Sequence, residues 1–195
     1  MVKIAILGSG KGSNCRAILQ AVREGRLAAT PVAVISDVKN APILEIAREF
    51  GVPHTCLSPG DFRTRLDPGA EAELVRILRE ANTEFVVLAG FMRILKKAIL
   101  NAFPRRIINI HPSLLPKFPG LRAWEQALAA REKITGVTVH YVDELIDHGD
   151  IIAQREVPVL ETDTPDSLHK RIQQAEHALY PEALRQVFAQ YASAA

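Results

Sequence analysis

Asn109 and His111 stand two residues apart in the segment INIHPSLLPKFPG, residues 108–120. If the apolar residues before them form a strand, both side chains leave on one face, because strand residues alternate between faces. A carboxamide beside an imidazole suits reactions in which a carbonyl oxygen becomes an oxyanion: the amide donates a hydrogen bond, and the imidazole donates or shuttles a proton. Taken alone, the histidine suits equally well a structural role in the turn before Pro112.

A carboxylate that could assist this histidine is found in the segment VDELIDHGDII. It contains four acidic residues, Asp143, Glu144, Asp147 and Asp150. One of them could orient His111 or receive a proton through water, whereas a solvated acidic loop is the simpler interpretation. The spacing favours none of the four.

The glycine-rich segment GSGKGSN, residues 8–14, joins a predicted strand to a predicted helix, a junction that often binds an anion. A Walker A loop requires serine or threonine directly after its lysine, but Gly12 follows the lysine here. Gly8 and Gly10 supply only the first half of a dinucleotide fingerprint, although Asp37 could contact a ribose. Nucleotide triphosphate chemistry is therefore disfavoured, and dinucleotide binding is a weak alternative.

A small phosphate monoester fits this loop better. The backbone amides of Gly12, Ser13 and Asn14 would point outward at the helix start, where the helix dipole favours an anion. The alternative is that Ser13 only caps the helix and the glycines only turn the chain.

Short apolar runs alternate with helical patterns over most of the chain. We predict strands at residues 3–8, 31–37, 85–90 and 106–112, and helices at residues 13–25, 41–51 and 70–82. This alternation predicts a mostly parallel sheet covered by helices. Because such sheets build their sites beyond the carboxyl ends of the strands, we expect the glycine loop and the Asn109–His111 pair at neighbouring strand tips.

The pattern changes from about residue 134. Two strands, at residues 135–142 and 151–159, follow one another without a helix, and a long helix capped by Thr164 comes next, with Pro181 expected to kink or restart it. Its predicted buried stripe contains Leu168, Ile172, Ala175 and Leu179. We therefore predict an α/β fold: a mostly parallel twisted sheet flanked by helices, with an antiparallel C-terminal portion, in one domain over residues 1–195.

Composition excludes several classes of protein. A chain of 195 residues with a net charge of +2 has no broad basic surface for nucleic acid or membrane. Cys15 and Cys56 are too few for a disulfide framework, so both are predicted to be buried free thiols. No metal-ligand spacing is visible, and the short apolar run at the start predicts a strand rather than a signal peptide, so we expect a cytoplasmic protein.

Five segments resemble a known family in their order and spacing: LGSGKGSN, VVLAGFMRIL, INIHPSLLPKFPGL, GVTVHYVDELIDHGDIIAQ and QQAEHALYP. The chain resembles, over essentially its whole length, the glycinamide ribonucleotide transformylase (phosphoribosylglycinamide formyltransferase) family. The resemblance implies a Rossmann-like formyltransferase fold. It also implies transfer of a formyl group from the co-substrate 10-formyltetrahydrofolate to the amine of glycinamide ribonucleotide in de novo purine biosynthesis.

The resemblance also implies a role for individual positions. The catalytic residues would be Asn109, His111 and Asp147, and the phosphate contacts Gly12, Ser13 and Asn14. Glu176, and Gln173 as a weaker match, would hold the rest of the ribonucleotide. The phosphate-binding half would span about residues 1–100, and the folate and catalytic half about residues 101–195.

For the folate, the resemblance implies an arginine fork at the glutamate tail and an apolar pocket for the pterin ring. Arg65 matches the tail arginine, with Arg63 as a rival. The pocket wall matches Met92, Arg93, Ile94 and Leu95, with Asn109 nearby. By composition alone, the three apolar members of this wall would be core residues.

Some positions depart from the family. Many relatives have glycine at Leu145 and proline at Asp150, and some have histidines at Arg122 and Trp124. These differences affect the expected loop conformation and the rim of the site more than the chemistry.

Four alternatives remain. Methionyl-transfer-RNA formyltransferase shares the catalytic core but needs an RNA-binding domain, and formyltetrahydrofolate deformylase usually carries an extra N-terminal domain. A non-catalytic phosphosugar-binding module would leave the Asn109–His111 pair without a purpose, and a dinucleotide-dependent reductase fits least well. We expect two small-molecule substrates, no nucleic acid or membrane partner, and a monomer or homodimer.

Overall fold

The chain folds around a single mixed sheet of seven strands in the order β3-β2-β1-β4-β5-β6-β7. The structure, a computed structural model, describes residues 1–194. The strands are β1 (Val2–Leu7), β2 (Ala29–Ser36), β3 (His54–Cys56), β4 (Phe85–Leu88), β5 (Ile107–His111), β6 (Ile134–Tyr141) and β7 (Ile151–Pro158). The first five pair in parallel, whereas β5–β6 and β6–β7 are antiparallel, which confirms the predicted fold class.

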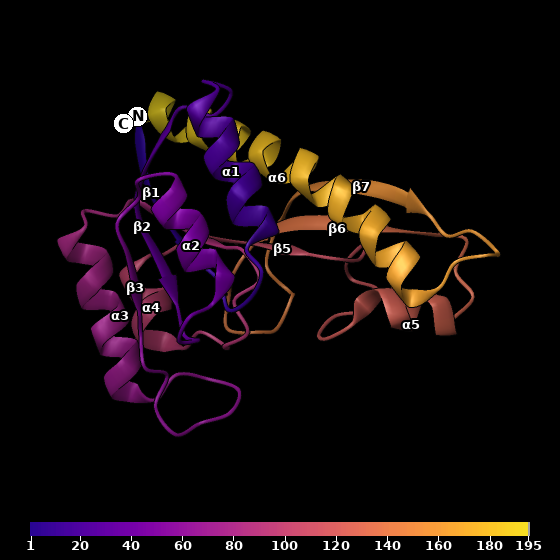
Figure 1. Cartoon of the computed structure of the whole chain (residues 1–195), viewed down its shortest axis with the longest axis horizontal. Helices are drawn as coiled ribbons and strands as arrows, with labels where there is room; N and C mark the ends of the chain where they lie inside the picture. The colour runs from indigo at the N-terminus through magenta and orange to yellow at the C-terminus, as the bar shows by residue number, and fades with distance from the viewer. Residues whose placement is uncertain (195) are drawn as a thin grey trace.

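Helices cover both faces of the parallel strands (Figure 1). One face carries α1 (Ser13–Arg23), α2 (Pro42–Glu49) and the long α6 (Pro165–Ala194). The other carries α3 (Pro68–Glu80) and α4 (Lys97–Ala102), and α5 (Ala123–Ala129) lies against α6. No helix within residues 1–194 is long and apolar enough to cross a membrane.

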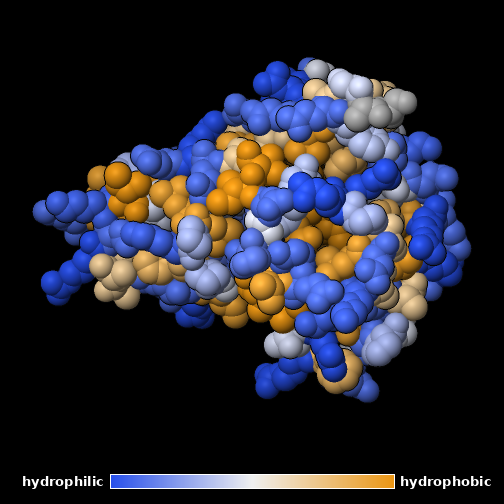
Figure 2. Space-filling model, turned by 180° about the vertical axis from the view of Figure 1, so that it is seen from behind, coloured by the Kyte–Doolittle hydropathy of each residue, from blue (hydrophilic) through white to orange (hydrophobic). Residues whose placement is uncertain are grey.

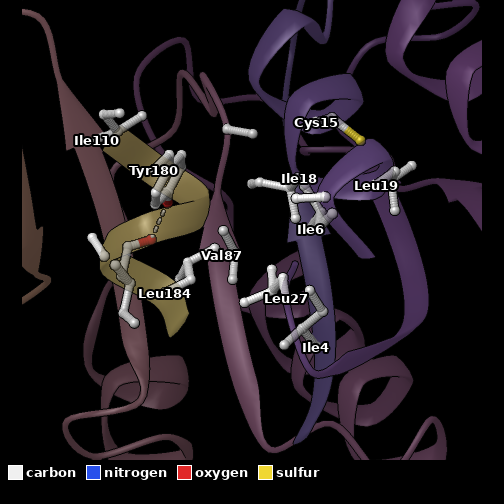
Figure 3. Packing of buried hydrophobic residues seen from close by; sticks show 14 of the residues in the cluster. Ile4, Ile6, Cys15, Ile18, Leu19, Leu27, Val87, Ile110, Tyr180 and Leu184 are labelled. Atoms are coloured by element: carbon white, nitrogen blue, oxygen red, sulfur yellow. Dashed lines mark hydrogen bonds between the residues drawn. The ribbon is translucent and has the colours of Figure 1, made fainter. Parts of the chain in front are cut away.

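Alternation along β1 builds two apolar cores, one on each side of the sheet. Ile4 and Ile6 pack toward α1 and α6, whereas Ala5 and Leu7 pack toward α3. Full burial of one such isoleucine or leucine stabilises the fold by about 1.5–3 kcal/mol. In the first core, the buried Tyr180 of α6 reaches across to the sheet, with its hydroxyl 3.0 Å from the Ile108 carbonyl (Figure 3).

The long helix begins as the sequence predicts. It starts at Pro165, and the Thr164 hydroxyl accepts a hydrogen bond from the Ser167 amide at 3.2 Å. The helix does not restart at Pro181, since it continues through this residue. Three of the four residues in the predicted stripe are buried, and Ala175 is partly buried.

Other expectations need correction. The sequence did not reveal β3, α4 or α5, which are short and lack strong periodicity. Cys15 is buried as expected, but Cys56 is exposed, because β3 forms an edge of the sheet where all three of its residues are exposed.

Candidate active site

The candidate site lies at the carboxyl edge of the parallel strands, where the loops after β1, β4 and β5 emerge. The strand order reverses between β1 and β4, a place where such sheets commonly bind ligands. The expectation that the glycine loop and the Asn109–His111 pair follow neighbouring strands is wrong, because β4 lies between β1 and β5. Two strand spacings separate these tips by roughly 10 Å.

His111 ends β5 with both ring nitrogens close to an acceptor. Its Nδ1 lies 3.2 Å from Asp147 Oδ2, and its Nε2 lies 2.8 Å from the Phe118 carbonyl. Burial lowers the pKa of His111, while the Asp147 charge and the Phe118 carbonyl oppose this shift. The neutral ring is therefore favoured near pH 7, but the Asp147 carboxylate and the Phe118 carbonyl can stabilise the cation when it forms.

Asp147 is the acid of its loop that faces this histidine. Burial pushes the pKa of Asp147 up, but His140, the His111 charge and the Gly120 amide outweigh it, so the pKa is lowered. The Gly120 amide donates to Oδ2 at 2.8 Å. Asp147 has a φ of 50°, a left-handed conformation that aspartate tolerates better than most residues. The carboxylate is therefore held ionised beside His111.

The other three acids point elsewhere. Asp143 accepts from the Leu145 amide at 2.9 Å and lies 3.0 Å from His148. Asp150 forms an exposed ion pair with Arg105 at 2.7 Å, and Glu144 is exposed. The loop also passes close to β6 at Gly149, where an added Cβ would lie 1.9 Å from the Tyr141 carbonyl oxygen. The structure therefore identifies Asp147 as the acid that faces His111, which the spacing in the sequence did not.

His140 is a site residue that sequence reasoning missed. It pairs with Asn109 across the antiparallel β5–β6 ladder, and Asn109 Nδ2 lies 3.2 Å from His140 Nε2. The other ring nitrogen, Nδ1, lies 2.8 Å from the Tyr141 carbonyl. His140 Nε2 also lies 3.6 Å from Asp147 Oδ1. Pairing the predicted strand at 135–142 with β5 would have revealed this contact.

The loop after β5, which supplies Phe118 and Gly120, is tied to β6 by Thr138. The buried hydroxyl of Thr138 donates to the Ser113 carbonyl at 2.7 Å and accepts from the Leu115 amide at 3.0 Å. These bonds fix the start of the loop that positions His111 and Asp147.

The glycine loop begins α1 in a form suited to an anion. Gly12, not Ser13, is the N-cap residue, so the alternative in which Ser13 caps the helix is wrong. Gly12 has a φ of 75°, and an added Cβ would lie 2.9 Å from Ile43 Cα, so glycine is required here. No side chain caps this helix, which leaves first-turn amides free for a ligand. A pocket of about 550 Å³ opens beside the loop, lined by residues that include Lys11, Ser13 and His177.

Asn14, the second residue of α1, meets Glu176 of α6. Asn14 Nδ2 donates to Glu176 Oε2 at 3.0 Å, and both residues are buried. Burial raises the pKa of Glu176 to about 7, although the Asn14 hydrogen bond opposes this. The Asn14 side chain is therefore engaged with Glu176, and its backbone amide is the group left for an anion. Gln173 lies one helical turn before Glu176 and is half-buried.

The positions matched to folate lie around the segment after β4. Arg65 is exposed, stacks 4.1 Å above the centre of the Phe62 ring and pairs with Ile94 in a short parallel bridge. Met92 is 57% exposed, whereas Leu95 is buried, so only part of the predicted wall faces outward. Arg93 turns its side chain inward to Asp37.

Some large apolar side chains are exposed on or near these loops. Seen from behind, the molecule shows hydrophobic patches across the middle of its face, among hydrophilic residues (Figure 2). The exposed large apolar residues include Met92, Leu121, Leu145 and Ile146.

Two of the positions that depart from the family are exposed and charged: Arg122 lies 3.4 Å from Glu125, and Asp150 pairs with Arg105. Within residues 1–194, no group of three or more histidine, cysteine or acidic residues is arranged to hold a metal.

Comparison with known proteins shows which family this chain belongs to. The formyl transferase family model matches residues 2–184, and the chain belongs to that family. Among solved structures, glycinamide ribonucleotide transformylase 1 from Symbiobacterium toebii superimposes with a TM-score of 0.91 at 46% identity, covering 95% of this chain and 86% of that one.

Two curated relatives narrow the class further. The phosphoribosylglycinamide formyltransferase of Bacillus subtilis is 38% identical over 96% of this chain and 95% of its own length. The trifunctional purine biosynthetic protein adenosine-3 of Drosophila pseudoobscura pseudoobscura is 47% identical over 93% of this chain. The match covers only 13% of that much longer protein.

Proposed function

We propose that this chain transfers a formyl group from 10-formyltetrahydrofolate to the primary amine of glycinamide ribonucleotide, a step of purine biosynthesis. The observation that carries the proposal is the contact of His111 with Asp147, 3.2 Å apart, beside Asn109 and near an uncapped helix start. The similarity to enzymes named for this reaction supports the choice of substrates.

In this mechanism, the substrate amine attacks the formyl carbon and the formyl oxygen becomes negatively charged. Asn109 donates to that oxygen with an amide held by His140. His111 takes the proton that the attacking nitrogen loses and returns it to the departing folate nitrogen, while Asp147 stabilises the transient imidazolium. To face the reacting atoms, His111 Nε2 exchanges the Phe118 carbonyl for the substrate.

Substrate binding divides between the loop after β1 and the segment after β4, both at the carboxyl edge of the sheet. The backbone amides of Gly12, Ser13 and Asn14 hold the 5-phosphate, and Glu176 with Gln173 holds the remainder of the ribonucleotide. Met92 and Ile94 enclose the pterin beside the buried Leu95, and Arg65 meets the glutamate tail. The phosphate-binding half, about residues 1–100, and the folate and catalytic half, about residues 101–195, are thus interleaved in this proposal. The folate residues Arg65 and 92–95 lie within the first 100 residues. Cytoplasmic location and a monomeric or dimeric state stay predictions.

The test mixes the protein with 10-formyltetrahydrofolate and follows folate absorbance with and without glycinamide ribonucleotide. The proposal expects turnover only when the ribonucleotide is present. Turnover without the amine acceptor would identify a hydrolase, and no turnover in either case would favour a binding module.

A further inference from the structure

Asp37 and Arg93 form an ion pair beneath the carboxyl edge of the sheet. Arg93 Nε lies 2.6 Å from Asp37 Oδ2, and their side chains are 17% and 2% exposed. Because charges lose hydration when buried, such a pair is a poor source of stability compared with apolar packing. Its presence here calls for another explanation.

Arg93 also holds a neighbouring loop. Its Nη1 donates to the carbonyl of Phe62 at 2.8 Å and to the carbonyl of Arg63 at 2.6 Å. Leu57 and Leu66 are buried, but residues 58–65 between them are exposed or half-buried. Apolar packing therefore does little to order this loop, and the bonds from Arg93 tie its centre to the sheet.

The same loop presents Arg65. The Arg65 guanidinium stacks on the Phe62 ring, and the Phe62 carbonyl is one of the two that Arg93 holds. The amide of Ile94, next to Arg93, donates to the Thr64 carbonyl at 2.9 Å. Arg93 thus holds the residue on which Arg65 stacks, and its neighbour Ile94 holds the backbone next to Arg65.

The pair also reaches the glycine loop. The Ser9 hydroxyl donates to Asp37 Oδ1 and accepts from the Met92 amide at 2.8 Å. Asp37 therefore connects the segments after β1, β2 and β4, and it is unavailable for the ribose contact considered from the sequence.

We propose that Arg93 is a positioning residue that builds the site for the folate tail, acting through Arg65 without contacting the ligand itself. The identity of the ligand rests on the proposed function, whereas the ordering of the loop does not. Arg93 and Arg65 then carry out distinct tasks: one orders the loop and the other binds the tail carboxylates.

The first experiment replaces the pair together, Asp37→Asn with Arg93→Met, because removing one partner alone leaves a buried charge and endangers folding, and asparagine keeps an oxygen that accepts from the Ser9 hydroxyl of the glycine loop. We expect the KM for 10-formyltetrahydrofolate to rise about tenfold, as two charge-assisted hydrogen bonds are lost, with kcat and the ribonucleotide KM within about twofold. A folate analogue without the glutamate tail should show no change in KM. Arg48→Met, which removes an exposed arginine of α2, is the matched control.

Adding Arg65→Met to the double variant should raise the folate KM no further than Arg65→Met alone, because both changes abolish the same interaction. Amide hydrogen exchange at residues 61–66 should accelerate at least about tenfold in the double variant and stay unchanged in Arg65→Met. Unchanged exchange, additive KM effects, or an equal loss for the tail-free analogue would overturn the proposal. Exchange is measured without turnover, so it tests Arg93 even if the proposed reaction fails.

Discussion

Asn14 and Glu176 join the start of α1 to the middle of α6 through a buried hydrogen bond of 3.0 Å. The contact connects the anion-binding loop to the helix that also carries Gln173. It places the carboxyl group of Glu176, whose pKa is raised by burial, beside the proposed ribonucleotide site. The protonation of this group therefore affects the stability of the fold.

Glu176→Gln should stabilise the protein at alkaline pH. The pKa of Glu176 is raised from 4.5 to about 7, so between these values the folded state binds more protons and the free energy of unfolding falls as pH rises. The loss is on the order of 3 kcal/mol. The variant should therefore unfold at higher urea concentration than the parent at pH 8, with the difference shrinking toward pH 5.

Affinity for the ribonucleotide should fall in the same variant if Glu176 binds it. Glu80→Gln, at an exposed residue of α3, serves as control and should show neither effect. A stability gain of equal size at both pH values would contradict the raised pKa.

His111→Ala should abolish formyl transfer while leaving ribonucleotide binding nearly intact. The imidazole lies at the tip of β5, whereas the proposed phosphate contacts lie at the start of α1, two strands away. Calorimetric titration with the ribonucleotide and a turnover assay measure the two effects. Comparable loss of both would show that His111 is structural.

Asp147→Asn should lower kcat by about 10²-fold or more, because the amide cannot support the imidazolium of His111. Asp150→Asn is the matched control, since Asp150 forms only an exposed ion pair with Arg105, and its kcat should change less than about twofold. If Asp150→Asn proved the more damaging substitution, the choice of acid would be wrong.

Trp124 and His169 stack between α5 and α6, with ring centres 3.8 Å apart and planes 4° from parallel. Burial and the Lys11 charge lower the pKa of His169. Because Trp124 is the only tryptophan, its fluorescence should be quenched as His169 becomes protonated, with a midpoint below pH 6.5. His169→Gln should remove this transition. A midpoint above pH 6.5 would contradict the lowered pKa.

The sequence predicts those elements that are determined by interactions between residues close together in the chain. Apolar runs of strand length and the capped start of α6 identify most of the sheet and its longest helix. The short β3, α4 and α5 carry too few periodic residues to be recognised, and Cys56 is exposed because β3 forms a sheet edge, which depends on strand order.

Site contacts between distant segments depend on the tertiary fold. Spacing brings Asn109 and His111 to one face, but only the approach of the 143–150 loop distinguishes Asp147 from its acidic neighbours. The contact of His140 with Asn109 follows from antiparallel register. The inward turn of Arg93 toward Asp37 joins residues 56 positions apart, which no local pattern reveals.

The central claim is that one formyl group passes directly from folate to the ribonucleotide amine at the Asn109–His111 tip of β5. Single-turnover NMR with a ¹³C-formyl-labelled folate tests it most directly. The account predicts that the label appears as an N-formyl carbon on the ribonucleotide with the wild-type protein, and stays on the folate with His111→Ala. Label recovered as free formate from the wild-type protein in the presence of the amine would contradict it.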